Sequence, residues 1–400
     1  MDEHRQGVSE LMPAPTPMSV SIDEAVGRVL AKDVCARFPI PSFDNSAVDG
    51  FAVRHDEVAG ASSVRPAELT VHAIAPAGTD IRLGDLPPRS AVQIMTGAPL
   101  PPALDTVIPV EWTTGFVAGP GQQVQITAHP DYGANIRRRG EDLRAGALAL
   151  RAGDVLHPAR TAVLAALGAT SVSVYRPLRV AVMSTGTELT EPSKQLHHGQ
   201  IYESNGVMLS AAIRAAGASA ERLPFVSDDI RLFRDALAEY SQSVDLIVTT
   251  GGISAGTHEV VKSALTQEEV SFMQVAIKPG KPQGIGHYRG TPIVCFPGNP
   301  VSAYTSFEVF LRPQLRRVMG YRATARQVVR ACLGSAIPKR GQADQYRLGI
   351  YEDGVADPVS TGASHSIRAL GAANCLIVLP VGLEGAEGDV VEVWLLDGPH

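Results

Sequence analysis

The residues best suited to chemistry in this 400-residue chain stand in short glycine-rich turns that follow apolar runs. The clearest turn, Gly251 to Gly256, lies between the apolar run Leu246 to Val248 and a segment of helical periodicity, Val260 to Leu265. Glycines let the backbone approach a ligand closely, and the free N–H groups at the start of a helix favour phosphate or carboxylate. The stretch therefore predicts an anion site, with a plain structural turn as the alternative.

Three further polar turns occur in the same part of the chain. Ser184 to Glu188 and Pro297 to Pro300 each follow an apolar run, and Ile277 to Pro282 carries Lys278 and Lys281 in a proline-stiffened turn. Two ammonium groups in a stiff turn can meet a phosphate at little ordering cost, although each lysine alone is typical of a solvated surface. Because α/β folds bind ligands beyond the carboxyl ends of their strands, the four turns together predict a site for a phosphate-bearing ligand.

Polar segments elsewhere allow two interpretations each. Residues 42–53 hold two aspartates and an asparagine, which also suit Asx turns, and residues 135–142 set three arginines beside two acids, as a self-compensating surface cluster would. Near the C-terminus, Arg347 and the hydroxyl-rich loop 360–366 would coordinate an oxyanion, with a surface turn as the alternative for the loop.

These turns need a scaffold, and the pattern from Leu178 to Gly320 predicts a doubly wound α/β domain. The expected strands are Arg179–Met183, Leu246–Thr249 and Ile293–Phe296. The expected helices are Asn205–Ala216, Ile230–Tyr240, Val260–Leu265 and Val301–Met319, the last interrupted at Pro313. Earlier in the chain, we expect a helix over residues 20–34 with Ser21 as its N-cap, and a short helix over 160–167 that ends at Gly168.

The remaining segments are rich in short strands. Residues 53–139 read as a small β module, in which residues 68–74, 93–96 and 124–127 are strand-like, and residues 325–400 read as a compact C-terminal β module. The expected strands of the C-terminal module are Val328–Leu333, Tyr346–Tyr351, Cys375–Leu379 and Val390–Leu396.

Composition narrows the protein class. Apolar residues make up 44% and charged residues 19%, and no apolar run is long enough for a membrane helix. The acidic N-terminus does not suit a secretory signal, so we expect a cytoplasmic protein of two to four domains. The four cysteines are far apart, which argues against a zinc cluster or disulfide framework, and a net charge of −6 without a basic arm gives no reason to expect nucleic acid.

Eight motifs together resemble the molybdopterin molybdenumtransferase family, the MoeA proteins, whose relatives include the E domain of gephyrin. They are Asp44–Gly50, Thr96–Pro99, Asn135–Asp142, Ser184–Leu189, Ser204–Asn205, Thr250–Gly256, Lys278–Pro282 and Pro297–Pro300, in the order of the family and over nearly the whole chain. The resemblance implies a homodimer of four-domain subunits. Its expected domains are a split N-terminal helical domain (1–40 plus 140–177), a β-rich insert (41–139), a central molybdopterin-binding domain (178–324) and a C-terminal β-barrel-like domain (325–400).

The resemblance also implies a reaction: adenylated molybdopterin, delivered by the adenylating enzyme of the pathway, accepts molybdate and releases AMP with the help of Mg²⁺. The residues that match catalytic or metal-binding positions are Asp49, Thr96, Asp142, Glu188 and Glu259, of which the four carboxylates would hold the metal. The residues that match substrate-binding positions are Gly251, Gly252, Ser254, Gly256, Lys278, Lys281, Pro297, Asn299, Arg347 and Ser364, the last two being those associated with molybdate.

The sequence departs from the family pattern at two places. Glu259, beside His258, stands where an aspartate is common, and Val48 replaces a methionine-like residue. Two other functions compete with the transferase: a non-catalytic scaffold of the gephyrin type, and a nucleotide hydrolase built on the central domain. The scaffold function has little support, because the sequence shows no long linker or partner-binding tail. The hydrolase function leaves residues 41–142 and 325–400 without a role.

Overall fold

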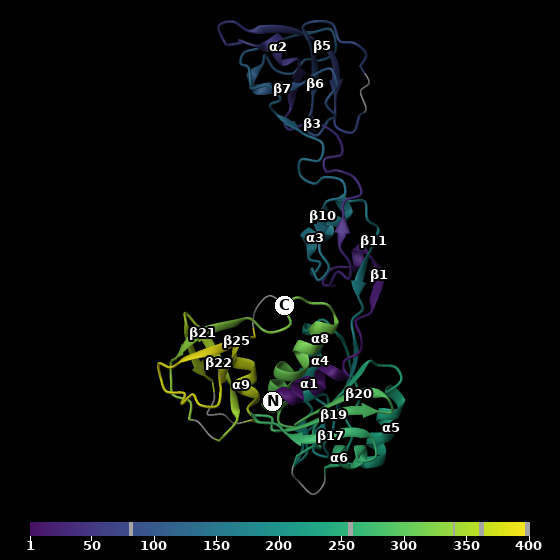
Figure 1. Ribbon diagram of the computed structural model, residues 1–400, viewed down its shortest axis with the longest axis vertical. Helices are drawn as coiled ribbons and strands as arrows, with labels where there is room; N and C mark the ends of the chain where they lie inside the picture. The colour runs from purple at the N-terminus through teal and green to yellow at the C-terminus, as the bar shows by residue number, and fades with distance from the viewer. Residues whose placement is uncertain (80–82, 255–258, 339–340, 360–363, 397–400) are drawn as a thin grey trace. The chain divides into compact units, whose positions relative to one another are not determined.

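The computed structural model describes residues 1–79, 83–254, 259–338, 341–359 and 364–396, which form two compact units (Figure 1). One unit comprises residues 1–32, 152–161 and 170–400, and the other comprises residues 33–151 and 162–169. The second unit is therefore inserted into the chain of the first. Among the described residues, no helix combines the length and apolarity needed to cross a bilayer.

The first unit is built on a six-stranded sheet. Its strands, in spatial order, are β15 (Ser219–Arg222), β12 (Arg179–Ser184), β16 (Leu246–Thr250), β20 (Thr291–Phe296), β19 (Pro282–Tyr288) and β17 (Glu269–Gln274). The first four are parallel, and β19 and β17 are antiparallel to their neighbours. The three expected central strands are confirmed, while the order could not be read from the sequence.

Alternate residues of the central strands face two separate cores, as a doubly wound sheet requires. Val180 and Val248 pack in the core of α4 (Asn205–Ala215), whereas Ala181 and Ile247 pack in that of α5 (Ile230–Tyr240) and α6 (Val260–Leu265). The expected helices at these positions are confirmed. The last expected helix is interrupted as predicted, because a π-helical turn, η3 (Phe307–Leu311), separates α7 (Pro300–Ser306) from α8 (Arg312–Val318) and places Pro313 in the first turn of α8.

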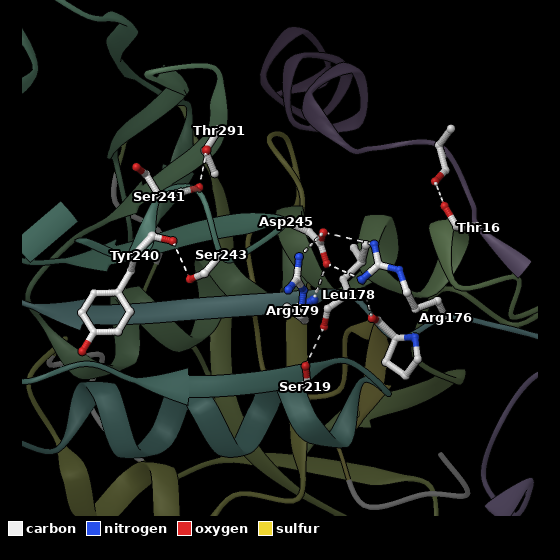
Figure 2. A network of polar contacts seen from close by, with 12 residues as sticks. Thr16, Arg176, Leu178, Arg179, Ser219, Tyr240, Ser241, Ser243, Asp245 and Thr291 are labelled. Atoms are coloured by element: carbon white, nitrogen blue, oxygen red, sulfur yellow. Dashed lines mark hydrogen bonds and ion pairs between the residues drawn. The ribbon is translucent and has the colours of Figure 1, made fainter. Parts of the chain in front are cut away.

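A polar network fixes the edge of the sheet where β12 and β16 begin (Figure 2). Asp245 accepts hydrogen bonds of 2.8 and 3.1 Å from the two Nη atoms of Arg176 and one of 2.7 Å from the backbone N–H of Arg179. Burial opposes ionisation of this carboxyl, but these donors lower the pKa of Asp245. The edge opposite to the predicted site is thus held by charge-assisted bonds.

The C-terminal strands close into a barrel. The ring runs through β22 (Asp344–Glu352), β23 (Val355–Pro358), β21 (Val328–Leu333), β25 (Val390–Leu395) and β24 (Cys375–Leu379), and β24 pairs back to β22. A short helix, α9 (Ile367–Ala372), precedes β24, and β18 (Ile277–Lys278) adds to β22 from outside the ring. The expected β-barrel-like module is confirmed.

The expected helix over residues 20–34 is wrong. Strand β1 (Pro17–Ser21) pairs with β11 (Ser171–Tyr175), and only a 3₁₀ turn, Ile22–Glu24, follows it. Gly27 has a φ of +81°, which ends helical geometry, and the buried Val29 and Leu30 form bridges with residues 155 and 174. The apolar stripe is real, but distant strands cover it. The first helix, α1 (Asp2–Leu11), was not predicted from the sequence.

The second unit is mostly β structure, as expected. Its sheet has the order β7 (Thr106–Pro109), β4 (Gly50–Val53), β6 (Ser90–Ile94), β5 (Ala67–Ala75) and β8 (Gln123–Ile126). Two small ribbons accompany it, β3 (Asn45–Ser46) with β9 (Ile136–Arg137) and β2 (Val34–Cys35) with β10 (Leu148–Leu150), together with α2 (His55–Val58) and a 3₁₀ turn, Val110–Trp112.

The remaining elements are α3 (Pro158–Ala166) and a ribbon of β13 (Leu189–Thr190) with β14 (Ile201–Tyr202). The helix expected over 160–167 is confirmed as α3, and Gly168 follows it with a φ of +68°. All four cysteines are free thiols, as expected. The division into four domains stays a prediction.

Candidate functional site

The predicted turns begin side by side at one edge of the central sheet. Ser184, Thr250 and Phe296, the last residues of three neighbouring parallel strands, are register partners. Strand β19 runs the other way, so its first residue, Pro282, lies at the same edge as the end of β20. The convergence of the four turns, expected from the sequence, is therefore present in the fold.

Gly251 needs to be glycine for two independent reasons. Its φ is +97°, and a Cβ added there would lie 2.5 Å from the carbonyl oxygen of Thr185. Gly252 also has a positive φ, +63°. The N–H groups of Gly251 and Ser254 donate inside the protein, to the carbonyl of Phe296 and to the carboxylate of Glu259. Within the described part of this turn, the N–H groups of Gly252 and Ile253 have no acceptor. Gly256 lies outside the described residues.

Asn205 connects the turns after β16 and β20. Its Nδ2 donates to Thr250 Oγ1 at 3.1 Å and to the carbonyl of Gly298 at 2.6 Å, while Thr250 Oγ1 donates to the carbonyl of Pro297 at 2.9 Å. Asn205 thus holds the glycine turn and the Pro297 turn in fixed relation. Its motif, Ser204–Asn205, was recognised in the sequence, but its role as a clamp was not.

Lys278, Lys281 and Ser364 line one cavity of about 610 Å³. Its wall runs from Gln274 through the lysine turn, and Ser302 and the segment 341–343 complete it. Lys278 and Ser364 lie more than 80 positions apart in the sequence. The structure therefore places two cations and a hydroxyl around one space, which is large enough for a phosphate-bearing small molecule.

Hydrogen bonds fix both sides of this cavity. Gln283 Nε2 donates to the carbonyl of Gly280 at 2.6 Å and to Ser306 Oγ at 2.7 Å, which ties the lysine turn to α7. On the opposite side, Asn299 Nδ2 donates to Ser364 Oγ at 3.0 Å. The lysines and the serine are thus held by the same helix, α7, from its two ends.

Arg347 lies on β22 and is buried. Its Nη2 donates to Oε1 of the buried Gln345 at 2.9 Å, and the residue has a further interaction within the protein. Arg347 does not line the lysine cavity itself, so its expected part in binding molybdate stays a prediction.

Two predicted carboxylates of the first unit, Glu188 and Glu259, belong to the turns that follow β12 and β16. Glu188 is exposed, and its carboxylate oxygens fold back over Gly186, 2.6–2.8 Å from where a Cβ on that glycine would be. Glu259 precedes α6 and accepts the N–H of Ser254 at 2.7 Å. The longer arm of Glu259 therefore reaches back onto the turn.

A buried carboxylate that the sequence did not indicate lies at the same edge. Glu203 is 3% exposed and accepts from Ser184 Oγ at 2.8 Å and from the N–H of Gly206 at 2.6 Å, and Arg222 lies 3.3 Å away. It anchors the start of α4 to the end of β12. No periodicity or motif marks Glu203, and only the position of Ser184 at a strand end hinted at a polar neighbour.

In the second unit, Asp49 and Thr96 form a pair. Asp49 Oδ1 accepts from the backbone N–H of Thr96 at 2.7 Å and from its hydroxyl at 2.8 Å, and these bonds lower the pKa of Asp49. The exposed carboxylate keeps its second oxygen for another partner. Thr96 therefore orients Asp49, a role that the sequence did not reveal.

The arginines of residues 135–142, in the second unit, are partly neutralised by nearby acidic side chains, as one of the two interpretations of the sequence predicted. Asp44 accepts from Arg138 Nη1 at 2.8 Å and from the N–H of Arg139 at 2.7 Å. The bond from Arg139 and then that from Arg138 lower the pKa of Asp44. Asp142 is exposed, and its carboxylate has no partner among the residues that the structure describes. Among all residues that the structure describes, no group of three or more His, Cys, Asp or Glu side chains is close enough together to hold a metal ion.

Three family models match consecutive parts of the chain. Residues 1–168 match the MoeA N-terminal region (domain I and II), residues 181–317 match a probable molybdopterin binding domain, and residues 330–396 match the MoeA C-terminal region (domain IV). The three models together account for most of the sequence.

Curated relatives and solved structures agree with these models over nearly full length. The chain is 43% identical to molybdopterin molybdenumtransferase 2 of Mycobacterium tuberculosis (strain ATCC 25618 / H37Rv), over 98% of both chains. It is 33% identical to molybdopterin molybdenumtransferase of Haemophilus influenzae, over 95% of this chain and 94% of the relative. The crystal structure of the molybdopterin biosynthesis moea protein from Pyrococcus horikosii superimposes with a TM-score of 0.85 at 30% identity, covering 100% of this chain and 99% of that one.

Proposed function

The chain belongs to the molybdopterin molybdenumtransferase family, and from this we propose that it inserts molybdate into adenylated molybdopterin with release of AMP in molybdenum cofactor biosynthesis. The observation that carries the proposal is the cavity lined by Lys278, Lys281 and Ser364 beside the carboxyl edge of a parallel sheet. Neither competing function, scaffold or nucleotide hydrolase, is favoured by a feature of the structure.

The lysine cavity supports the binding of the phosphoanhydride. Adenylated molybdopterin carries two linked phosphates, whose charges the ammonium groups of Lys278 and Lys281 would neutralise. Cleavage by water leaves one phosphate on AMP and one on the pterin, so negative charge increases as the products form. Cations positioned beforehand by Gln283 and α7 stabilise that increase without reorganising.

Ser364 and Arg347 are our candidates for the molybdate side of the reaction. Molybdate is a tetrahedral dianion that needs hydroxyl and cationic donors, and Ser364 lies in the same cavity as the lysines. Asn299 donates to Ser364 Oγ and so leaves the serine hydroxyl hydrogen free to donate to an oxyanion.

We propose Mg²⁺ as the cofactor, because carboxylate oxygens are the ligands that this hard cation prefers. Thr96 lowers the pKa of the exposed Asp49 and leaves one of its carboxylate oxygens unengaged, which is what a hard cation requires of a carboxylate. Asp49, Asp142, Glu188 and Glu259 are the residues that would hold the ion, which when bound would offset the charge of the phosphates.

The family resemblance supports three further proposals. The protein would act as a homodimer in the cytoplasm, and it would take its substrate from the adenylating enzyme of the pathway. If the carboxylates and lysines of one site belonged to different subunits, a mixture of Asp49→Asn and Lys281→Ala proteins would regain activity through heterodimers.

The test is incubation with adenylated molybdopterin, Mg²⁺ and molybdate, with AMP and inserted metal measured together. We expect both to appear in equal amounts. Replacement of Lys278 or Lys281 by alanine removes a charge-assisted contact and should weaken substrate binding about ten- to a hundredfold. Lys194→Ala, at an exposed lysine outside the cavity, is the matched control and should bind normally.

Two results would count against the proposal. AMP release without metal insertion would favour the nucleotide hydrolase, and substrate affinity unchanged in both cavity variants would place the phosphates elsewhere.

A further inference from the structure

A second cavity, separate from the lysine cavity, lies where the long interrupted helix meets the barrel. It has a volume of about 510 Å³ and is lined by Arg312 and Arg316 of α8, by residues 322–327, which lead to β21, and by Leu395 of β25. It shares no lining residue with the lysine cavity. The expected functions of the chain assign it no role.

Four guanidinium groups line this second cavity, and two carboxylates lie close to them. Arg326 forms a bidentate pair with the buried Glu308, at 2.8 and 2.9 Å, and the same carboxylate lies 3.7 Å from Arg312. Arg322 lies 3.3 Å from Asp154, which also faces another arginine at 3.5 Å. Each carboxylate is thus shared between two cations, so the cavity carries a surplus of positive charge.

Among the four arginines of this cavity, Arg316 has no carboxylate partner among the described residues. It is 4% exposed, its Nε donates to the carbonyl of residue 323 at 2.8 Å, and its guanidinium carbon lies 3.9 Å from the ring centroid of Tyr321. Its two terminal nitrogens have no acceptor among the described residues. Burial lowers the pKa of Arg316 and, with help from Arg326, that of Arg312 to about 10. Since a buried cation is costly without an anion, the arrangement is that of an incomplete ion cluster.

We propose that this arginine cavity binds a doubly charged tetrahedral oxyanion, either free phosphate or the terminal phosphate of a small molecule. Arg316 supplies the unengaged fork of N–H donors from inside, and Arg322, with a side chain 56% exposed, supplies a second guanidinium at the mouth. Arg312 and Arg326, whose donors also hold the carbonyls of residues 324 and 396, form the charged wall. The bound anion completes the charge balance between α8 and the barrel.

Isothermal titration calorimetry at constant ionic strength tests the proposal. Inorganic phosphate and glycerol 3-phosphate are titrated separately into the full chain carrying Lys278→Ala and Lys281→Ala, which removes the cations of the other cavity. We expect saturable binding of at least one probe at millimolar concentration or below. Adding Arg316→Gln should weaken it about ten- to a hundredfold, the loss expected for a charge-assisted contact.

Arg322→Gln keeps the test decisive if Arg316→Gln fails to fold, because Arg322 is mostly exposed, and it should also weaken binding about tenfold. The matched control is Arg317→Gln, which removes an exposed arginine next to Arg316 on the same helix but outside the cavity. Tighter binding of glycerol 3-phosphate than of phosphate identifies a phosphate monoester as the ligand, and the reverse identifies the free ion. No saturable heat with either probe, or an equal loss in Arg317→Gln, overturns the proposal.

Discussion

Protonation of His4 should release helix α1 in mild acid. His4 is 2% exposed, its ring packs edge-on against Phe310 with centroids 4.7 Å apart, and neither ring nitrogen has a hydrogen-bond partner among the described residues. Burial lowers the pKa of His4 from 6.5 to about 4. The folded protein therefore holds His4 neutral, whereas the detached helix would expose an imidazole of ordinary pKa.

The sign and size of the effect follow from these two values. Because the detached state binds the extra proton between pH 6.5 and about 4, the stability of the docked helix is complete above pH 6.5 and declines as the pH falls towards 4. At about pH 5 the loss is about 2 kcal/mol, and over the full interval it is about 3 kcal/mol. A loss of 2 kcal/mol corresponds to an approximately thirtyfold rise in the population of the detached helix.

Hydrogen-exchange mass spectrometry of α1 measures this population directly. Amide protection in Gly7 to Leu11, corrected for the intrinsic pH dependence of exchange, should fall about thirtyfold between about pH 7.5 and about pH 5. In His4→Leu, which removes the titrating group and keeps an apolar side chain of similar size, protection should stay nearly constant. His198→Leu, at an exposed histidine, is the control for loss of a histidine in general. Equal pH dependence in the native protein and in His4→Leu would refute the reasoning.

Three other substitutions test the packing around the site. Glu203→Ala should lower the free energy of unfolding, measured by urea titration, by about 2–4 kcal/mol, because Arg222 and the N–H of Gly206 lose their buried acceptor. A smaller change would show that water replaces the carboxylate. Gly251→Ala should cost about 1–3 kcal/mol and disturb the turn, whereas Gly119→Ala, where a Cβ meets nothing within 4 Å, should be neutral in the same thermal assay. Asp245→Asn should destabilise the protein most near pH 7. Because the pKa of Asp245 is lowered in the folded protein, the carboxylate contributes stability above the unfolded value of about 3.9, and this contribution is lost as the pH falls through the folded value. The stabilities of the two proteins should therefore converge in acid, and a constant difference would contradict the assignment.

The sequence was informative where local pattern and tertiary environment agree. Phe233 and Leu237 form the buried stripe of α5, and the helix matches the expected range, Ile230–Tyr240. The segment 20–34 has an equally good stripe, yet its buried residues face strands that lie more than a hundred positions later in the chain. The periodicity of apolar residues predicts which residues are buried. It predicts the backbone conformation only when the element that covers them lies nearby in the chain.

The site was predictable to the extent that strand ends are predictable. An apolar run that stops at glycine marks the carboxyl end of a strand, and parallel strands bring such ends together, which is why Gly251 was found. The lysine turn was found from its composition, two lysines in a turn stiffened by proline. The roles of Asn205 and Glu203 were not found, because they depend on reaching across to Thr250 and Ser184, and such distances are set by the sheet order. The pairing of Asp49 with Thr96 was hidden for the same reason.

The strand that carries Lys278 has a consequence for what the lysine cavity admits. Residues 277 and 278 form β18, which is paired with β22 of the barrel, and four residues later the same chain enters β19 of the central sheet. The backbone of the lysine turn is therefore anchored to the barrel at one end and to the sheet at the other. Side-chain substitutions in the cavity should change how tightly a ligand is held, whereas the largest ligand that can enter is determined by main-chain pairing. Selectivity for size and selectivity for charge thus rest on different features of the same turn, its main-chain pairing and its side chains.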